Sequence, residues 1–102
     1  MATLAKTVYS HVTKDPEVCG GRACIDGTRI RVMDVVGLQQ QGYRAEKVVE
    51  AYPSLNLAQV YAALSYYYEN PLEIAAAFDE DRRIAQEIED DRAKFFSERS
   101  AK

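Results

Sequence analysis

The sequence has few of the residues that build metal sites and cross-linked scaffolds. It contains two cysteines, Cys19 and Cys24, and one histidine, His11. Two cysteines are too few for a disulfide scaffold, and together with His11 they would offer a metal only three ligands at an unfamiliar spacing. We therefore expect two reduced, half-buried thiols, and neither a metal nor another cofactor.

Long apolar runs are also missing. No run approaches the roughly 20 residues that cross a bilayer, and residues 1–10 lack the apolar centre of a signal peptide. We expect a cytoplasmic protein without membrane contact. Its 102 residues, 47% apolar and 28% charged, fit one folded domain. A domain of this size buries only a modest share of its surface, which favours a homodimer.

Positive charge is not in excess either. The net charge is −3, and all of the negative excess lies in the last third of the chain. Residues 1–70 carry seven basic and seven acidic side chains, whereas residues 71–102 carry six basic and nine acidic ones. A protein that binds DNA by itself usually has a basic patch. The balance argues mildly against unaided DNA binding, unless a dimer concentrates the few arginines.

Catalytic motifs are absent as well. The sequence has no glycine-rich phosphate loop before a helix, no zinc-ligand spacing and no Ser-His-Asp set that His11 would complete. Its carboxylates crowd into residues 79–81 and 87–91, where a run of charge is typical of a solvated helix face. We expect no enzymatic activity.

A hairpin signal lies in residues 18–32, which are typical of strand material. Asp26-Gly27 divides this stretch and favours a tight turn in which both residues have positive φ. After the turn, Arg29 and Arg31 alternate with apolar residues, so one strand face is basic. These arginines would either hold phosphates or pair inside the fold, and for Arg29 we favour the structural role. The carboxylates available for pairing are Asp34, Glu46 and Glu50.

Three helices are predicted to follow the hairpin. Helical spacing extends over three stretches, residues 33–41, 45–51 and 57–68. Gly42 suits a left-handed cap after the first helix, and Pro53 ends the second. Asn56 caps the third helix, and Gln59 completes a capping box. Because a tight turn joins the second and third helices, we predict a mainly α fold: a short β-hairpin, a three-helix helix-turn-helix core and a long C-terminal helix.

The third helix would read the DNA bases in such a motif. Its expected exposed face consists of Gln59, Ala62, Ala63 and Tyr66. Glutamine can read adenine, and alanine can contact the thymine methyl group. Since this helix has no lysine or arginine, phosphate anchoring would fall to residues outside it: Arg22, Arg29, Arg31, Arg44 and Lys47. The same helices would equally form a plain packed pair, with the alanine and tyrosine face as a dimer contact.

The C-terminal helix has a clear start at Asn70-Pro71, with Glu73 at its third position. Residues 72–78 are apolar enough to pack on the core. Beyond them a thin apolar seam on a charged helix is weakly supported alone and better supported by a partner. The predicted partner-binding residues are Ile84, Ile88, Phe95 and Phe96. We thus divide the chain into an N-terminal arm (1–16), the hairpin and helix-turn-helix core (17–70) and a C-terminal tail (71–102).

Several of these motifs together resemble a small prokaryotic family, the domain of unknown function 433. The resemblance covers about residues 8–70, and its most specific parts are the Gly-Thr-Arg-Ile segment and the Tyr-Pro-x-Leu turn. The segments that carry it are residues 15–22, 25–30 and 52–55, the single residues Gly42, Val48 and Val60, and residues 62–67.

The family is similar to the DNA-binding antitoxins of the VapB type, which have a homeodomain-like helix-turn-helix and are often encoded beside a PIN-like ribonuclease toxin. The resemblance implies an antitoxin-type transcriptional regulator that binds its own operator DNA and neutralises such a toxin. One departure is Arg44, which stands where the family commonly has Ser or Thr to cap the second helix. The acidic tail and the uncharged reading helix leave an alternative open: a protein-interaction or oligomerisation module without DNA binding.

Overall fold

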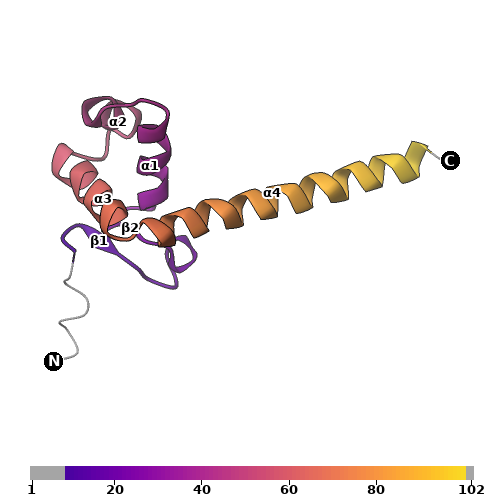
Figure 1. The fold of residues 1–102 in the computed structure, drawn as a ribbon, viewed down its shortest axis with the longest axis horizontal. Coiled ribbons are helices and arrows are strands. Elements are labelled where there is room, and N and C mark those ends of the chain that lie inside the picture. Colours follow the sequence, from indigo (N-terminus) through magenta and orange to yellow (C-terminus); the bar gives the residue numbers. More distant parts are fainter. Residues whose placement is uncertain (1–8, 101–102) are drawn as a thin grey trace.

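The computed structural model describes residues 9–100 (Figure 1). Residues 1–8 of the predicted arm and residues 101–102 of the predicted tail lie outside the described residues. The order of elements is strand β1, a 3-10 turn η2 (Cys19–Gly21), strand β2 and helices α1 to α4. The predicted fold class, a mainly α protein with a short hairpin and a long C-terminal helix, is confirmed.

Two short strands pair at the base of the core. Strand β1 (Val12–Thr13) runs antiparallel to β2 (Cys24–Ile25), with Val12 opposite Ile25. On its other side β2 meets the segment before the first helix, where Cys24 bridges Arg31 and the Ile25 N–H donates to the Ile30 carbonyl at 2.8 Å. Strand β1 lies in the stretch assigned to the N-terminal arm, where two residues are too few to give an alternating pattern.

The predicted hairpin turn exists, but its predicted backbone geometry is wrong. Gly27 has φ +79°, whereas Asp26 is not among the residues with positive φ. The Thr28 N–H donates to the Ile25 carbonyl at 3.0 Å. A single positive φ at the third residue is typical of a type II turn rather than of the type I′ turn that Asp-Gly favours.

Three helices form the core within one residue of their predicted bounds. They are α1 (Val32–Gln40), α2 (Ala45–Ala51) and α3 (Leu57–Glu69). Gly42, at φ +96°, turns the chain after α1. The capping box of α3 is confirmed, since Asn56 Oδ1 accepts from the Gln59 N–H at 2.9 Å and Gln59 Oε1 accepts from the Asn56 N–H at 2.8 Å.

The buried side chains lie where α1, α3 and the β pair meet. Helix α1 packs chiefly against α3, and α2 covers one end of that pair (Figure 1). Burial of this apolar surface is the main force that holds such short helices in place. The largest fully buried residues are Ile25, Val32, Val35, Val36, Val48 and Val60.

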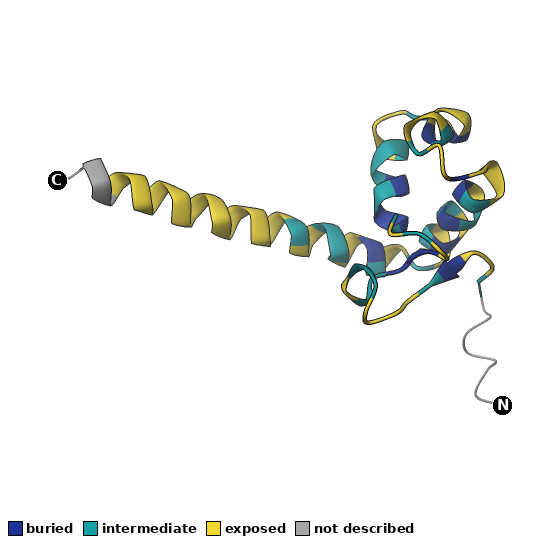
Figure 2. Cartoon of the chain, turned by 180° about the vertical axis from the view of Figure 1, so that it is seen from behind, coloured by how far each residue is buried: buried dark blue, intermediate teal, exposed yellow. Residues whose placement is uncertain are grey.

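Helix α4 (Pro71–Ser100) leaves this core and projects away from it (Figure 2). Its buried residue Ile74 and its half-buried residues Ala77 and Phe78 lie in the first two turns, with Phe78 beside Gly37 of α1. From residue 82 to residue 97 every side chain is exposed. The molecule is therefore 61 Å long, and its radius of gyration of 17.3 Å exceeds the roughly 13 Å of a compact domain of this length. No described helix has the length and apolar character needed to span a membrane.

Candidate functional site

Helices α2 and α3, with the turn between them, have the arrangement of a helix-turn-helix. The Tyr52 N–H donates to the Val48 carbonyl at 2.9 Å and ends α2. The Leu55 N–H then donates to the Tyr52 carbonyl at 2.9 Å, and the buried Leu55 side chain fixes the turn to the core. Because the turn is anchored at both ends, α3 is held rigidly relative to α2.

Two of the four residues predicted to form the exposed reading face of α3 are buried, so this part of the prediction is wrong. Ala63 and Tyr66 are 0% and 5% exposed, because α3 turns them towards the core together with Val60. The Tyr66 hydroxyl donates to Glu73 Oε1 at 2.7 Å, and its ring lies edge-on to Tyr9 at 4.7 Å. Neither Ala63 nor Tyr66 is available to a base edge.

The surface of α3 is formed by other residues. Gln59 and Ala62 are half-buried and reach the surface, while Tyr61 and Tyr68 are 55% and 62% exposed. Each of these tyrosines follows a leucine by four residues, which is the spacing of one helix face. Residues 57–68 contain no charged side chain. The sequence pattern therefore does not distinguish the solvent-exposed face of this helix from its buried face.

Two of the predicted phosphate anchors are occupied inside the fold. Arg31 Nη2 lies 2.9 Å from Asp34 Oδ1, and its Nε donates to Asp34 Oδ2 at 3.2 Å. This was the pairing left open for Arg31, and the hydrogen bond to Asp34 raises the pKa of the Arg31 guanidinium. Arg22 Nη1 lies 2.6 Å from Asp81 Oδ1 and its Nη2 lies 3.7 Å from Glu80. Neither Arg22 nor Arg31 is a free cation for DNA.

The other three predicted anchors remain exposed. Arg29, Arg44 and Lys47 take part in no ion pair among residues 9–97. Arg44 occupies the N-cap position of α2 without a side-chain cap, as its departure from Ser or Thr implied. Lys47 follows one turn later, with its Nζ 6.0 Å from the Tyr43 ring centroid.

These three cations do not form one patch. Arg44 and Lys47 lie on α2, whereas Arg29 belongs to the hairpin before α1. Helix α2 and the hairpin flank opposite ends of α1, which at nine residues is about 13 Å long (Figure 1). The structure thus brings together two of the predicted anchors, Arg44 and Lys47, near the start of the helix-turn-helix.

The predicted partner seam is exposed. Its four residues, Ile84, Ile88, Phe95 and Phe96, are each between 43% and 56% exposed, and the two phenylalanine rings lie edge to face at 5.7 Å. The charges beside the seam pair along the helix itself. Arg83 lies 3.2 Å from Glu80 and 3.3 Å from Glu87, and Arg82 pairs with Asp79. These pairs support the helix without covering its apolar residues.

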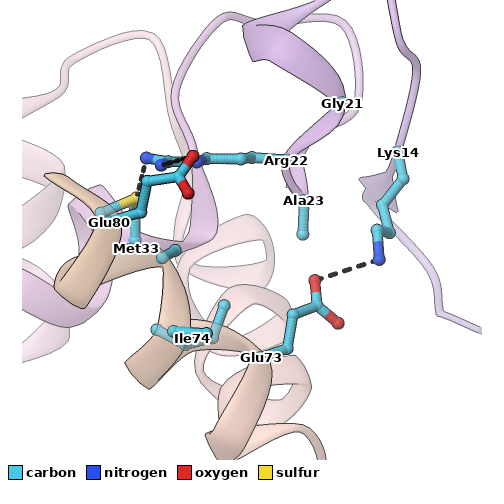
Figure 3. Close-up of a pocket in the computed structure, with 10 residues that line it drawn as sticks. Lys14, Gly21, Arg22, Ala23, Met33, Glu73, Ile74 and Glu80 are labelled. Carbon is cyan, nitrogen blue, oxygen red and sulfur yellow. Dashed lines mark hydrogen bonds and ion pairs between the residues drawn. The ribbon is translucent and has the colours of Figure 1, made fainter. Parts of the chain in front are cut away.

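A cluster of ion pairs at the base of α4 was not predicted. Lys14 Nζ lies 3.2 Å from Glu73 Oε2, and Arg22 reaches the carboxylates of Glu80 and Asp81, about two turns further along the helix. Figure 3 shows both cations facing α4 across an open groove of about 270 Å³, floored by Ala23, Met33 and Ile74. The partners are about 60 residues apart in sequence, so no local pattern indicated them. The cluster fixes the start of α4 to the loop before β2.

The family model and a solved structure point to the same family. Residues 12–67 match the model of the family described as "Protein of unknown function (DUF433)". An uncharacterized protein, y4eO, of Sinorhizobium fredii is 38% identical over 61 residues, which are 60% of this chain and 28% of the relative. The chain thus spans less than a third of that relative. The crystal structure of a DUF433 member from Anabaena variabilis is 33% identical, with a TM-score of 0.64 over 74% of this chain and 75% of that one.

Proposed function

The chain belongs to the family described as Protein of unknown function (DUF433), and we propose that this member is an antitoxin-type transcriptional regulator. In this proposal the helix-turn-helix core binds operator DNA and α4 binds a partner protein. The observation that carries the proposal is a division of the molecule into two parts. The core is complete by residue 81, yet α4 continues and exposes four large apolar side chains that the core does not use.

The core supports DNA binding through the placement of a few residues. In a helix-turn-helix, the first helix crosses the phosphate backbone and the N-terminal residues of the second contact base edges. Arg44 and Lys47 lie at the start of α2, and Gln59 and Ala62 reach the surface near the start of α3. Two phosphate contacts and a short reading surface give weak binding per subunit, which favours a homodimer that spans two half-sites. Operator binding would place the protein in the cytoplasm.

Helix α4 supports partner binding through its shape and charge. An amphipathic helix lays its apolar residues into a groove with anchors at helical spacing, as Ile84, Ile88 and Phe95 are spaced. Residues 79–91 carry seven acidic and two basic side chains. The groove that fits this helix is therefore apolar with a basic rim. A PIN-like ribonuclease is the partner that the family resemblance implies.

DNA binding is tested by fluorescence anisotropy on DNA from upstream of the gene and on an unrelated duplex, over a range of salt. We expect tighter binding to the upstream DNA, weakening with salt as counterions are released. The double variant Arg44→Gln with Lys47→Gln should reduce the salt slope by about 2 per subunit, and so by about 4 for the homodimer. The control, Arg82→Gln with Arg83→Gln, removes the same charge from α4 and should leave the slope unchanged. Equal weak binding to both duplexes would contradict the proposal.

Partner binding is tested by capture of the toxin from a neighbouring gene. Ile88→Asp together with Phe95→Asp should abolish capture, because two charges enter the apolar seam. The melting temperature of the core should stay nearly unchanged, since both residues are exposed. A much lower melting temperature would show instead that the seam belongs to the fold.

A second candidate function is an interaction module that does not bind DNA. It is favoured by the uncharged surface of α3, where Tyr61 and Tyr68 are exposed, because protein interfaces are rich in aromatic residues and poor in charge. The anisotropy experiment separates the two candidates. The module predicts no preference for the upstream DNA at any salt concentration, together with intact capture of a partner.

A further inference from the structure

The two thiols of the protein meet at the hairpin turn. Cys19 Sγ lies 3.2 Å from the Arg29 carbonyl oxygen, and Cys24 Sγ lies 3.8 Å from the Thr28 carbonyl oxygen. These two carbonyls are consecutive in the chain. Both sulfur atoms therefore lie against the same turn, although five positions separate the residues in sequence.

The backbone at Cys19 is unusual. Its φ is +54°, and Gly20 and Gly21 follow at +66° and +83°. Glycine adopts left-handed φ freely, whereas a residue with a β-carbon is strained there. Strained residues gather at functional sites, where the surrounding structure holds them. Here the strained conformation places the Cys19 thiol against the Arg29 carbonyl of the hairpin.

The two cysteines differ in their surroundings. Cys19 is half-buried, while Cys24 is fully buried between β1 and the segment before α1. Burial first, then the contact with Cys19 and the carboxylates of Asp26 and Asp15, raise the pKa of Cys24 to about 11. At neutral pH Cys24 is thus held as a protonated thiol. A hollow of about 390 Å³ lies beside it and is lined by both carboxylates.

We propose that Cys19 and Cys24 form a reversible intrachain disulfide when the protein meets a peroxide. The more exposed Cys19 reacts first: its sulfur takes one oxygen of hydrogen peroxide and becomes a sulfenic acid, and water is released. The Cys24 sulfur then attacks the Cys19 sulfur, and the hydroxide that leaves takes up the Cys24 proton as a second water. Two electrons pass from the thiols to the peroxide.

This disulfide would cross-link the two ends of the loop that holds α4 against the core. Between the two cysteines lies Arg22, whose guanidinium contacts Asp81 at 2.6 Å and Glu80 at 3.7 Å. A cross-link from Cys19 to Cys24 restricts this loop and so stabilises the attachment of α4 to the core. The inference goes beyond the proposed function, and it stands whether or not the core binds DNA.

The test treats the full-length protein with a small excess of hydrogen peroxide. We expect the intact mass to fall by two hydrogen atoms, one protease fragment to link Cys19 with Cys24, and dithiothreitol to reverse both changes. Added oxygen atoms without a linked fragment, or a disulfide-linked dimer, would overturn the proposal. No variant is needed for this measurement, so it does not depend on whether a substituted protein folds.

Single substitutions check the order of the reaction. In Cys24→Ser the sulfenic acid at Cys19 should persist and be trapped by dimedone, whereas Cys19→Ser should leave Cys24 unmodified over the same time. Trapping at Cys24 alone would overturn the assigned order. Hydrogen exchange over residues 71–81 should become several-fold slower in the oxidised wild-type protein. Identical exchange in the two forms, with the disulfide present, would overturn the link to α4.

Discussion

The two halves of α4 are helical for different physical reasons. In its first turns Ile74 is 2% exposed, and the carboxylates of Glu73, Glu80 and Asp81 pair with cations from the loops before β2. From residue 82 to residue 97 nothing is buried, and the pairs lie within the helix itself, as between Arg83 and Glu87. The first half is held by tertiary contacts, and the second by helix propensity and local pairs alone.

This difference bears on function. Local pairs contribute only about 0.2–0.5 kcal/mol each, so the outer half of α4 is the part of the described chain with the least to hold it. A segment of this kind can change partners without disturbing the core. Burial of its exposed isoleucines and phenylalanines against a partner would be favourable. The inner half of α4 is therefore held as part of the fold, whereas the outer half is the surface that we propose for partner binding.

The largest expected difference between the two halves of α4 is in the free energy of unfolding that an isoleucine contributes. Ile74→Ala should lower the free energy of unfolding by about 2–4 kcal/mol, because it opens a cavity under α4. Ile88→Ala should change it by less than about 0.5 kcal/mol, because this side chain is exposed. Urea unfolding of both variants measures the two values. Similar costs at the two positions would show that the outer half is packed against something in solution.

A smaller difference is expected for the aspartates of α4. Asp81→Asn should cost about 1–2 kcal/mol, because it removes the nearest carboxylate of the partly buried Arg22, at 2.6 Å, and leaves this arginine only Glu80 at 3.7 Å. Asp79→Asn should cost less than about 0.5 kcal/mol, since its pair with Arg82 is exposed. Thermal unfolding at low and high salt measures both. A loss for Asp79→Asn as large as for Asp81→Asn would contradict the comparison.

Local signals in the sequence predicted most of the fold. Asn56 with Gln59 marks the start of α3, Gly42 the end of α1 and Pro53 the end of α2, because each acts on the backbone beside it. The predicted partner seam also lies where it was placed, since an apolar stripe on a charged helix is visible in the sequence. These features depend on neighbours within four residues.

The candidate site was predicted less well, for two physical reasons. The buried face of α3 was predicted wrongly because tyrosines and alanines occur on both the buried and the exposed face of a helix. In addition, α3 has no charged residue before Glu69 that would identify its exposed face. The arginines were misassigned because an ion pair depends on which segments meet in space. Arg22 pairs with Asp81, which lies 59 positions later in the sequence. A pattern of neighbouring residues does not show which distant segments meet in the folded chain.

The smallest expected effect lies at the junction of α3 and α4, where Tyr66 was mistaken for a surface residue. Tyr66→Phe removes the hydroxyl that donates to Glu73 at 2.7 Å. It should cost about 1 kcal/mol at neutral pH, because Glu73 keeps its pair with Lys14. Tyr61→Phe is the matched control on the same helix, and it should cost less than about 0.5 kcal/mol, because Tyr61 is exposed.

The pH dependence of this effect has a definite sign. Burial, and then the hydrogen bond to Glu73, raise the pKa of Tyr66 above its ordinary value of 10.0. The folded protein therefore holds the phenol proton more tightly than the unfolded chain does. This contribution to stability is complete below the unfolded pKa and is lost as the pH rises above it. Urea unfolding of the wild-type protein and Tyr66→Phe between pH 7 and pH 11 should show the gap between them narrowing from about pH 10. A constant gap would mean that the hydroxyl is solvated, and that α3 presents this face to solvent after all.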